Sequence, residues 1–387
     1  MEKIKKKAPP LKGIKVLELA RVLAGPWAGQ LLADLGADVI KVESPIGDET
    51  RFWGATTDAE EDSSYFQATN RGKKSFIADF TKKEDLDAIY YIAKRADIII
   101  ENFKVGSLEK YGLDYESLRV KNSGLIYCSI TGFGQNGPFA SMPGYDFIIQ
   151  AMGGIMDLTG DPFGPPMKPG VAYADLFTSL YSVVAIQSAL LAKQKSEKGT
   201  FIDMSLFDTQ LAVLANQASS FLISGKIPKR MGNSHPSIVP YQAFDAKDGL
   251  IVIACGNDNQ FKALCDAFRW NFSSDKKFST NQNRVLNRTE LISEISHRLK
   301  LIGKDEITLL LQKAKVPVGS VNTVDQALNH PQALSRGMVK FVEGKAFVKT
   351  PIIFKDYDLN FEKASPELGA NSEMIRMKIK TGEIWEN

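Results

Sequence analysis

The strongest constraint on the fold is the alternation of short apolar runs with helical segments along the N-terminal half of the chain. Residues 14–19 form an apolar run, residues 27–35 have the pattern of a helix that ends at Gly36, and residues 37–43 form a second run. Strand, helix and strand in this order are typical of a βαβ unit with parallel strands. Further strand-like runs lie at 76–80, 97–101, 125–130 and 201–205. The alternation predicts an α/β fold with a Rossmann-like parallel sheet.

The length of the chain predicts more than one domain. At 387 residues it exceeds a single typical hydrophobic core, and its composition, 44% hydrophobic and 24% charged, is that of an ordinary globular protein. A basic, turn-rich segment at 226–236 has the character of a linker. We therefore expect a large Rossmann-like domain over 1–224, a smaller α+β central domain over 225–323, and a return over 324–387 to the large domain.

Charge and cysteine usage argue against several classes of protein. The net charge of +3, from 48 basic and 45 acidic residues, is too even to indicate a nucleic-acid partner. No apolar run approaches the length of a membrane span, and the basic residues 2–7 have no apolar segment behind them. Cys128, Cys255 and Cys265 have no metal-site spacing and suggest buried thiols in a reducing compartment. The sequence thus predicts a cytoplasmic protein with no metal and no membrane or nucleic-acid partner.

Asp175 is the most informative acidic residue. It follows a segment rich in glycine and proline that ends near Gly170, and it precedes an apolar stretch, 176–184, with the pattern of a helix. One interpretation is a helix N-cap, for which Asp is among the preferred residues. The other is a carboxylate nucleophile, held near the positive end of a helix and approached by substrate past the glycine. The residues alone leave both open.

Two other segments are candidates for ligand contact. The loop at 21–26 follows the first strand and should lie at the carboxyl edge of the sheet, where α/β proteins bind ligands. It lacks the G-x-G-x-x-G pattern, so a dinucleotide is not indicated. The irregular segment 44–71 contains Arg51, Trp53 and Tyr65, which are candidates for substrate contact, although solvated surface residues are as common in such loops.

From Leu11 to about Gly369 the chain resembles the family III CoA-transferases, the CaiB/BaiF type. The resemblance rests on LKGIKVLELARVLAGPWAGQLLADLGADVIKVE at 11–43, NRGKKS at 70–75, ADIIIENF at 96–103, SITGFGQNGP at 129–138, GYD at 144–146 and the G-x4-D that ends at Asp175. Each motif alone is weak, but the set in this order is specific. Within the family, residues 230–249 are most similar to succinyl-CoA:glutarate-type members.

The resemblance implies an enzyme that moves CoA from an acyl-CoA donor to a carboxylic acid, without ATP or metal. The aspartate of the family falls on Asp175, which would attack the donor thioester and pass through a mixed anhydride to an aspartyl-CoA thioester. Succinyl-CoA is the expected donor, and a dicarboxylate such as glutarate is the expected acceptor. The family also implies a homodimer of two interlocked chains.

Further site residues are expected by the same resemblance. Those expected to contact CoA are Val22, Leu23, Ala24, Lys73, Lys74, Asn102, Phe103 and Lys110. Those expected near the substrate are Tyr65, Tyr145, Arg51, Trp53, His235, Gly256, Asn257 and Gln260, with Arg230 beside His235 at the acceptor carboxylate. Residues 256–260 match the glycine lid over the aspartate but contain fewer glycines, so we expect a more restricted opening.

Two alternative functions stay open. Methylacyl-CoA racemases are similar over most of the chain, but they carry a histidine in place of Tyr145 and need an acid/base pair. The chain has three histidines, of which His297 and His330 do not have the context of a catalytic base. His235 could approach the acceptor carboxylate, although a linker histidine is at least as common. A non-catalytic acyl-CoA-binding protein would keep the same fold and bind CoA without exchange.

Overall fold

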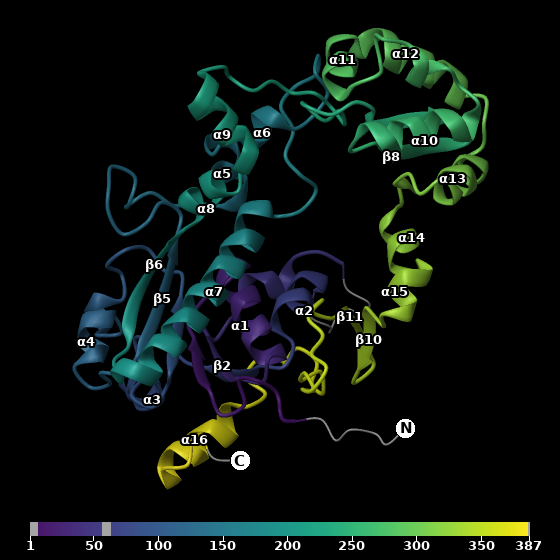
Figure 1. Cartoon of the computed structure of the whole chain (residues 1–387). Helices are drawn as coiled ribbons and strands as arrows, with labels where there is room; N and C mark the ends of the chain where they lie inside the picture. The colour runs from purple at the N-terminus through teal and green to yellow at the C-terminus, as the bar shows by residue number, and fades with distance from the viewer. Residues whose placement is uncertain (1–6, 56–62, 386–387) are drawn as a thin grey trace. The chain divides into compact units, whose positions relative to one another are not determined.

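The computed structural model describes residues 7–55 and 63–385, and these form two compact units (Figure 1). The first unit contains the chain up to Ile155, Pro169–Lys226 and the chain from Gln332 onward. The second contains Met156–Lys168 and Ile227–Pro331. The domains predicted from sequence are continuous segments, so the predicted central domain does not include residues 156–168, which belong to the second unit. The domain division at 1–224, 225–323 and 324–387 stays a prediction.

The first unit is built on the parallel six-stranded sheet that the strand–helix alternation predicted. The strand order is β3-β2-β1-β4-β5-β6. The strands are β1 Lys15–Glu18, β2 Asp38–Glu43, β3 Lys74–Ile77, β4 Ile98–Glu101, β5 Ile126–Thr131 and β6 Thr200–Ser205. From β1 the chain builds outward in one direction to β3 and then in the other to β6. Such a switch leaves a crevice at the carboxyl ends of the two central strands, β1 and β4.

Helices cover both faces of this sheet. On one face α1 (Ala24–Asp34) and α7 (Tyr173–Ser196) share a core with Val16 and Ile98. On the other, α3 (Lys83–Ala93), α4 (Tyr115–Arg119) and α16 (Ser372–Thr381) share a core with Leu17 and Ile99. Successive strand residues point to opposite faces, so burial on both sides explains why the strands are apolar without alternation.

The remaining elements of the first unit surround these layers. They include α2 Ser64–Asn70, α5 Asp146–Met152, α8 Leu206–Ala212, α9 Ala215–Ser224, β10 Val339–Val342 and β11 Lys345–Val348. Strands β10 and β11 form an antiparallel hairpin.

Helix α7 corrects one expectation about membranes. Its 24 residues, with a mean hydropathy of 1.4 over its most apolar window, are long and apolar enough to cross a bilayer. The statement that no apolar run approaches that length is therefore wrong. In the structure, α7 packs against α1, β5 and β6, with Val183 and Ile186 in the core. A core helix passes the same test of length and composition, so α7 is weak evidence for a membrane span.

The second unit combines a small antiparallel sheet with helices. Its strands are β7 Tyr241–Ala246, β8 Gly249–Ala254 and β9 Val318–Ser320, and its main helices are α10 Asp258–Phe268, α11 Asn281–Leu286, α12 Arg288–Leu299 and α13 Lys304–Lys313. Arg284 is fully buried and donates to the carbonyls of Val239 and Phe278. Cys255 and Cys265 lie in this core, and Cys128 lies in the first unit; all three thiols are buried and free, which confirms that expectation.

Replacement of Gly132 by Ala tests a close backbone contact in the first unit. A Cβ at Gly132 would lie 2.6 Å from the Cα of Gly144, so the two segments must separate. We expect Gly132→Ala to lower the free energy of unfolding by about 1–3 kcal/mol in urea titrations. Gly170→Ala is the matched control, because nothing lies within 4 Å of the added Cβ. Equal stability of the two variants would contradict the close packing.

Candidate active site

A cavity of about 370 Å³ opens at the carboxyl edge of the sheet. Its walls come from the turn after β1, the segment after β4, the loop after β5 and the first turn of α7, so it occupies the crevice that the strand order creates. The residues predicted for the site that line it are Val22, Leu23, Ala24, Asn102, Phe103, Tyr145 and Asp175. Residues more than 150 positions apart in the chain thus meet at one edge of the sheet.

Asp175 lies in the first turn of α7, and it is not the residue that caps the helix. The N-cap residue is Ala172, which has no side-chain cap, so the N-cap interpretation of Asp175 is wrong. The cap comes from Asp146, the first residue of α5. Its Oδ1 accepts hydrogen bonds from the N–H groups of Ala174 at 2.8 Å and Asp175 at 3.3 Å. Asp146 therefore accepts the hydrogen bonds of amides at the start of α7, and Asp175 lines the cavity.

The surroundings of Asp175 favour a protonated carboxyl near neutrality. Burial raises the pKa of Asp175 to about 7, and the negative charge of Asp146 contributes to the same shift. Within residues 7–55 and 63–385, no cation forms an ion pair with Asp175. A carboxylate that has lost part of its hydration and has no counterion is a better nucleophile than a solvated one.

Tyr65 and Trp53, both predicted near the substrate, lie together in the structure. Their rings meet edge to face with centroids 5.6 Å apart. Burial raises the pKa of the Tyr65 hydroxyl, and the charges of Asp175 and Asp146 raise it further. Tyr65 therefore lies within the electrostatic field of both carboxylates and keeps its proton.

A second cavity of about 350 Å³ shares two lining residues with the first, Arg21 and Phe103. The Arg21 guanidinium lies 5.8 Å from the centre of the Phe103 ring, and the Asn102 side chain accepts from the N–H of Arg21 at 2.9 Å and donates to its carbonyl at 2.7 Å. Tyr111 lines this second cavity, and the ammonium of the exposed Lys110 lies 4.7 Å from its ring centre. The structure thus places Lys110 beside the second cavity.

The two lysines expected at a CoA phosphate are engaged elsewhere. Lys73 is 2% exposed, and its ammonium pairs with Glu18 at 2.8 Å. It also donates to the Pro26 carbonyl and to the Asn70 side-chain oxygen, each at 2.8 Å, so its three donors are used and none is left for a phosphate. Lys74 begins β3 at the amino edge of the sheet, opposite the cavity, and pairs with Asp38 at 2.7 Å. Both positions argue against the predicted contact.

Arg51 is likewise a structural residue. Its guanidinium donates two hydrogen bonds of 2.8 Å to the carboxylate of Glu43, and it lies 3.7 Å from the ring centre of Phe66. It is 5% exposed. A buried bidentate pair of this kind leaves no group for an incoming carboxylate, which argues against a substrate role.

The other predicted substrate residues belong to the second unit. Asn257 caps α10 by accepting from the Gln260 N–H at 2.9 Å, and Gln260 Oε1 accepts from the Gly256 N–H at 2.7 Å. Helix α10 begins at Asp258, so the expected loop 256–260 is in part helical. His235 packs against Tyr241 with ring centroids 5.1 Å apart. The approach of these residues to Asp175 stays a prediction.

Arg230, expected beside His235 at the acceptor acid, holds the segment 156–168 instead. It forms an ion pair of 2.9 Å with Asp157 and donates to the carbonyls of Asp161 and Gly164. These bonds use its donors within the second unit.

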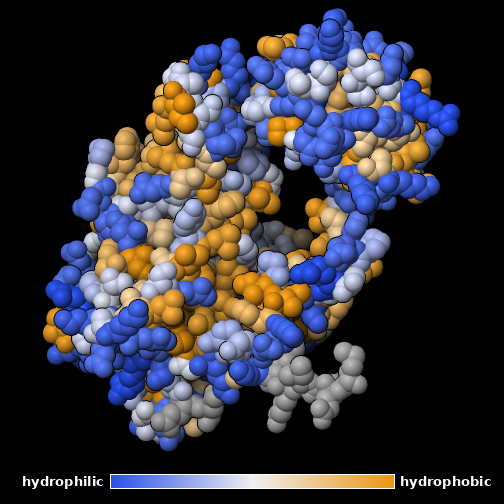
Figure 2. Space-filling model, viewed as in Figure 1, coloured by the Kyte–Doolittle hydropathy of each residue, from blue (hydrophilic) through white to orange (hydrophobic). Residues whose placement is uncertain are grey.

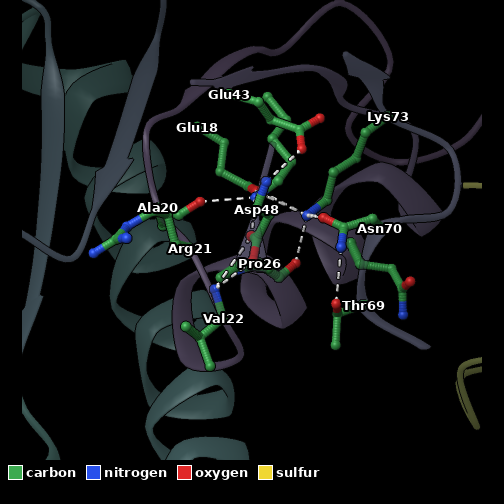
Figure 3. Close-up of polar contacts among 12 residues, drawn as sticks. Glu18, Ala20, Arg21, Val22, Pro26, Glu43, Asp48, Thr69, Asn70 and Lys73 are labelled. Carbon is green, nitrogen blue, oxygen red and sulfur yellow. Dashed lines mark hydrogen bonds and ion pairs between the residues drawn. The ribbon is translucent and has the colours of Figure 1, made fainter. Parts of the chain in front are cut away.

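Sequence analysis missed a buried ionic network behind the turn that follows β1. Lys41 is fully buried and lies 3.1 Å from Glu18 and 3.0 Å from Asp48. Asp48 in turn accepts a hydrogen bond from the N–H of Val22 at 3.2 Å (Figure 3). The signal was present, since Glu18 and Lys41 interrupt two otherwise apolar strands, and charged residues are rarely buried unless paired. Among the described residues, no group of three or more His, Cys, Asp or Glu side chains could hold a metal ion.

Comparison with known proteins agrees with this geometry. The family model of CoA-transferase family III matches residues 11–372. The succinate–glutarate CoA-transferase of Agrobacterium fabrum is 47% identical over 387 residues, which cover 97% of each chain. The succinyl-CoA:glutarate CoA-transferase of Homo sapiens is 40% identical over 377 residues, which cover 96% of this chain and 86% of that protein.

A solved structure shows the same fold at high identity. The crystal structure of a CAIB/BAIF family protein from Brucella suis superimposes with a TM-score of 0.89 at 51% identity, covering 96% of this chain and 100% of that one. The resemblance seen in the motifs is thereby confirmed over nearly the whole chain. The chain is a transferase that belongs to CoA-transferase family III.

Proposed function

We propose that this chain transfers CoA from succinyl-CoA to glutarate, with Asp175 as the nucleophile. The observation that carries the proposal is the Asp175 carboxyl, which lines the cavity at the carboxyl edge of the sheet, forms no ion pair among the described residues and has a pKa raised to about 7. The names of the similar enzymes from Agrobacterium fabrum and Homo sapiens supply the donor and the acceptor.

The reaction then proceeds by exchange of acyl bonds. The Asp175 carboxylate attacks the thioester carbonyl of succinyl-CoA, the C–S bond breaks, and a mixed anhydride and CoA thiolate form. The thiolate attacks the aspartyl carbonyl of the anhydride, which releases succinate and leaves an aspartyl-CoA thioester. Glutarate attacks that thioester, and the returning thiolate attacks the glutaryl carbonyl, which releases glutaryl-CoA and restores the carboxylate. Each step exchanges one activated acyl bond for another, so no ATP is consumed.

Local hydrogen bonds hold the nucleophile relative to the turn after β1. Ser179, one turn further along α7, donates to the Ala24 carbonyl at 2.6 Å and lies 2.9 Å from the Asp175 carbonyl. Helix α1 begins at Ala24 without a side-chain cap. The first amides of a helix have no intrahelical acceptor, so those of Ala24 and Gly25 are suited to stabilise an oxyanion formed at Asp175.

The two adjoining cavities suit a long, divided substrate such as an acyl-CoA. The thioester end would occupy the cavity with Asp175, and the nucleotide end would occupy the cavity with Ser44 and Tyr111. Arg21 and Phe103, which line both, would lie along the connecting pantetheine arm. Lys110, beside Tyr111, is the predicted phosphate contact that this placement retains.

The same site suggests the two alternatives that an experiment must separate. An acid with a pKa near 7 can also remove a proton, as a methylacyl-CoA racemase requires. Tyr145, however, stands where those enzymes carry histidine, and no histidine is among the described residues that line the cavity. A protein that binds acyl-CoA without exchange would have no need for a desolvated acid in the cavity.

We further propose that two copies of the chain associate, interlocked as the family implies. A groove of about 1110 Å³ in the first unit is lined by apolar side chains of α1, α7 and the segment after β10, among them Leu31, Val184 and Phe347. Apolar side chains gather on the face of the molecule over α1 and α7 (Figure 2). A large exposed apolar surface of this kind is typical of an interface. The buried free thiols are in keeping with the reducing cytoplasm.

Replacement of the nucleophile tests the proposed chemistry. Asp175→Ala should lower formation of glutaryl-CoA from succinyl-CoA and glutarate by about 1,000-fold or more, because no covalent intermediate can form. Products are measured by mass spectrometry with a panel of acids that includes itaconate, mesaconate, citramalate and oxalate. Asp208→Ala, an exposed acid in the first turn of another helix, is the control and should keep its activity. Exchange by Asp175→Ala would refute the role of the acid.

Wild-type protein that binds CoA but exchanges no acid of the panel would favour the alternatives. Deuterium incorporation from solvent into a 2-methylacyl-CoA would then identify a racemase, and its absence a binding protein.

The pH dependence of acylation tests the electrostatics of the site. In a single turnover, release of CoA from succinyl-CoA should increase with pH as Asp175 ionises, with a midpoint near its pKa of about 7. Asp146→Asn keeps an oxygen that can cap α7 but removes a negative charge that raises this pKa, so the midpoint should move to lower pH. Asp208→Asn should leave it in place. A midpoint unchanged by Asp146→Asn would show that another group sets it.

Sedimentation velocity tests association. Wild-type protein should sediment as a species of twice the 42.7 kDa chain mass. Val184→Glu places a charge on the exposed part of the groove and should shift the protein to smaller species, since burying an unpaired charge is unfavourable. Val120→Glu, at an exposed site outside the groove, is the control. A wild-type monomer would contradict the proposal.

A further inference from the structure

From the contacts of the turn after β1, we infer that Asp48 is a positioning residue for CoA transfer. Its buried carboxylate holds Val22 in a left-handed backbone conformation, and this conformation sets the part of the cavity wall formed by Leu23 and Ala24. The inference deepens the proposed function, because the turn that Asp48 holds lines the same cavity as the nucleophile Asp175.

Val22 has a backbone that its side chain disfavours. Its φ is +69°, in the region that glycine and, less often, asparagine adopt. A β-branched residue is strained there because its side chain crowds the backbone. Such a conformation persists only when its surroundings hold it, and strained residues of this kind gather at functional sites.

Asp48 provides the holding interaction. Its two carboxylate oxygens lie 3.2 and 3.4 Å from the Val22 nitrogen, whose N–H donates to them (Figure 3). The carboxylate also accepts from the N–H of Thr50 at 3.0 Å and from its hydroxyl at 2.8 Å, and it lies 3.0 Å from the ammonium of Lys41. Asp48 is 1% exposed, so these donors stand in for water. The carboxylate that accepts from Val22 is therefore held in place by three further donors, the N–H and the hydroxyl of Thr50 and the ammonium of Lys41.

The same partners stabilise the negative charge of Asp48. Burial by itself would raise the pKa of Asp48, but Lys41 and the donors of Thr50 outweigh it and hold the pKa below its usual value. The hydrogen bond from Val22 is therefore made to an ionised acceptor, and such bonds are stronger than neutral ones. Lys41 also has Glu18 at 3.1 Å and the Ala20 carbonyl at 2.8 Å, so it does not depend on Asp48 alone.

The turn at residues 21–24 is connected to the nucleophile through Ser179. Val22 is followed by Leu23, the N-cap of α1, and by Ala24, whose carbonyl accepts from Ser179 on α7. Ser179 lies on the turn of α7 that follows Asp175, and it also bonds to the Asp175 carbonyl. If Val22 relaxed to a right-handed or extended conformation, the start of α1 would move relative to Asp175. Misplacement of this kind reduces the rate of the chemical step more than it reduces binding.

The test combines loss of the acceptor with relief of the strain. Asp48→Ala should lower the rate of Asp175 acylation by about 30-fold and leave the dissociation constant for CoA within about threefold, since the defect is one of position. Adding Val22→Gly to Asp48→Ala should restore the rate about tenfold, because glycine adopts a positive φ without strain. A crystal structure of Asp48→Ala should show Val22 outside the left-handed region.

A matched control separates this effect from simple loss of stability. Asp34 is another buried aspartate paired with a buried cation, Arg71, and it makes no described contact with residues 21–24. Asp34→Ala should lower the melting temperature to a similar degree, keep the acylation rate of the folded protein within about twofold and show no rescue by Val22→Gly. If Asp48→Ala does not fold, Asp48→Asn takes its place; it keeps an oxygen for the Val22 N–H and should retain most of the rate while losing stability.

Three outcomes would overturn the inference: a wild-type rate in folded Asp48→Ala, a lowered rate that Val22→Gly does not restore, or an unchanged φ at Val22 in the variant structure. A large loss of rate in Asp48→Asn without loss of the Val22 hydrogen bond would do the same. The readout is acylation of Asp175 by any acyl-CoA that the wild type accepts, so failure of glutarate as acceptor does not affect it. If no acyl-CoA acylates the wild type, the proposed function fails, and the backbone of Val22 in the variant structure still decides the role of Asp48.

Discussion

The site depends on two carboxylates near the start of α7, one of which caps the helix while the other lines the cavity. Asp146 accepts the hydrogen bonds of the helix N-terminus, and its second oxygen accepts from Gln150 at 2.7 Å, so it is held as an acceptor. Asp175, in the first turn of the helix, does not cap it and forms no ion pair with a cation among the described residues. Its charge is therefore destabilised by burial and by its neighbour. Two acids of the same type thus acquire different chemistry from their surroundings alone, as in other enzymes that place acids in contrasting environments.

A second group of charges supports the opposite wall of this cavity. Glu18 ends β1, Lys41 lies in β2, Asp48 follows β2 and Lys73 precedes β3, and all four side chains are buried. Removing charges from water is unfavourable, and a buried ion pair often contributes less to stability than an apolar pair of the same size. What this network does provide is a set of fixed acceptors and donors, which hold a strained turn against relaxation. Its Asp48 carboxylate reaches that turn from the segment that follows β2, where this strand ends at the carboxyl edge of the sheet.

The sequence indicated which residues meet at one edge of the sheet where this follows from the end of a strand, but it gave no indication of contacts that depend on a side chain's partner. Val22, Asn102 and Asp175 line one cavity because the strands and the helix that precede or carry them end at one edge of a parallel sheet. Lys73 was expected at CoA from the family resemblance, and Arg51 near the substrate from its place in an irregular segment. Both side chains instead pair with buried acids, Lys73 with Glu18 across 55 positions and Arg51 with Glu43 across eight. Asp146 was noticed as part of a motif, but its capping of α7 across 28 positions has no signature in the local sequence.

The sequence by itself determined the parallel α/β architecture, because strands buried on both faces are largely apolar and alternate with helices. It also determined the family, because a series of motifs in one order covers most of the chain. Only the tertiary structure decided which acid caps α7, which lysine is buried and which turn is strained. These features arise from contacts between segments that the fold brings together, and the free energy of a buried charge is set by those contacts rather than by its neighbours in the chain.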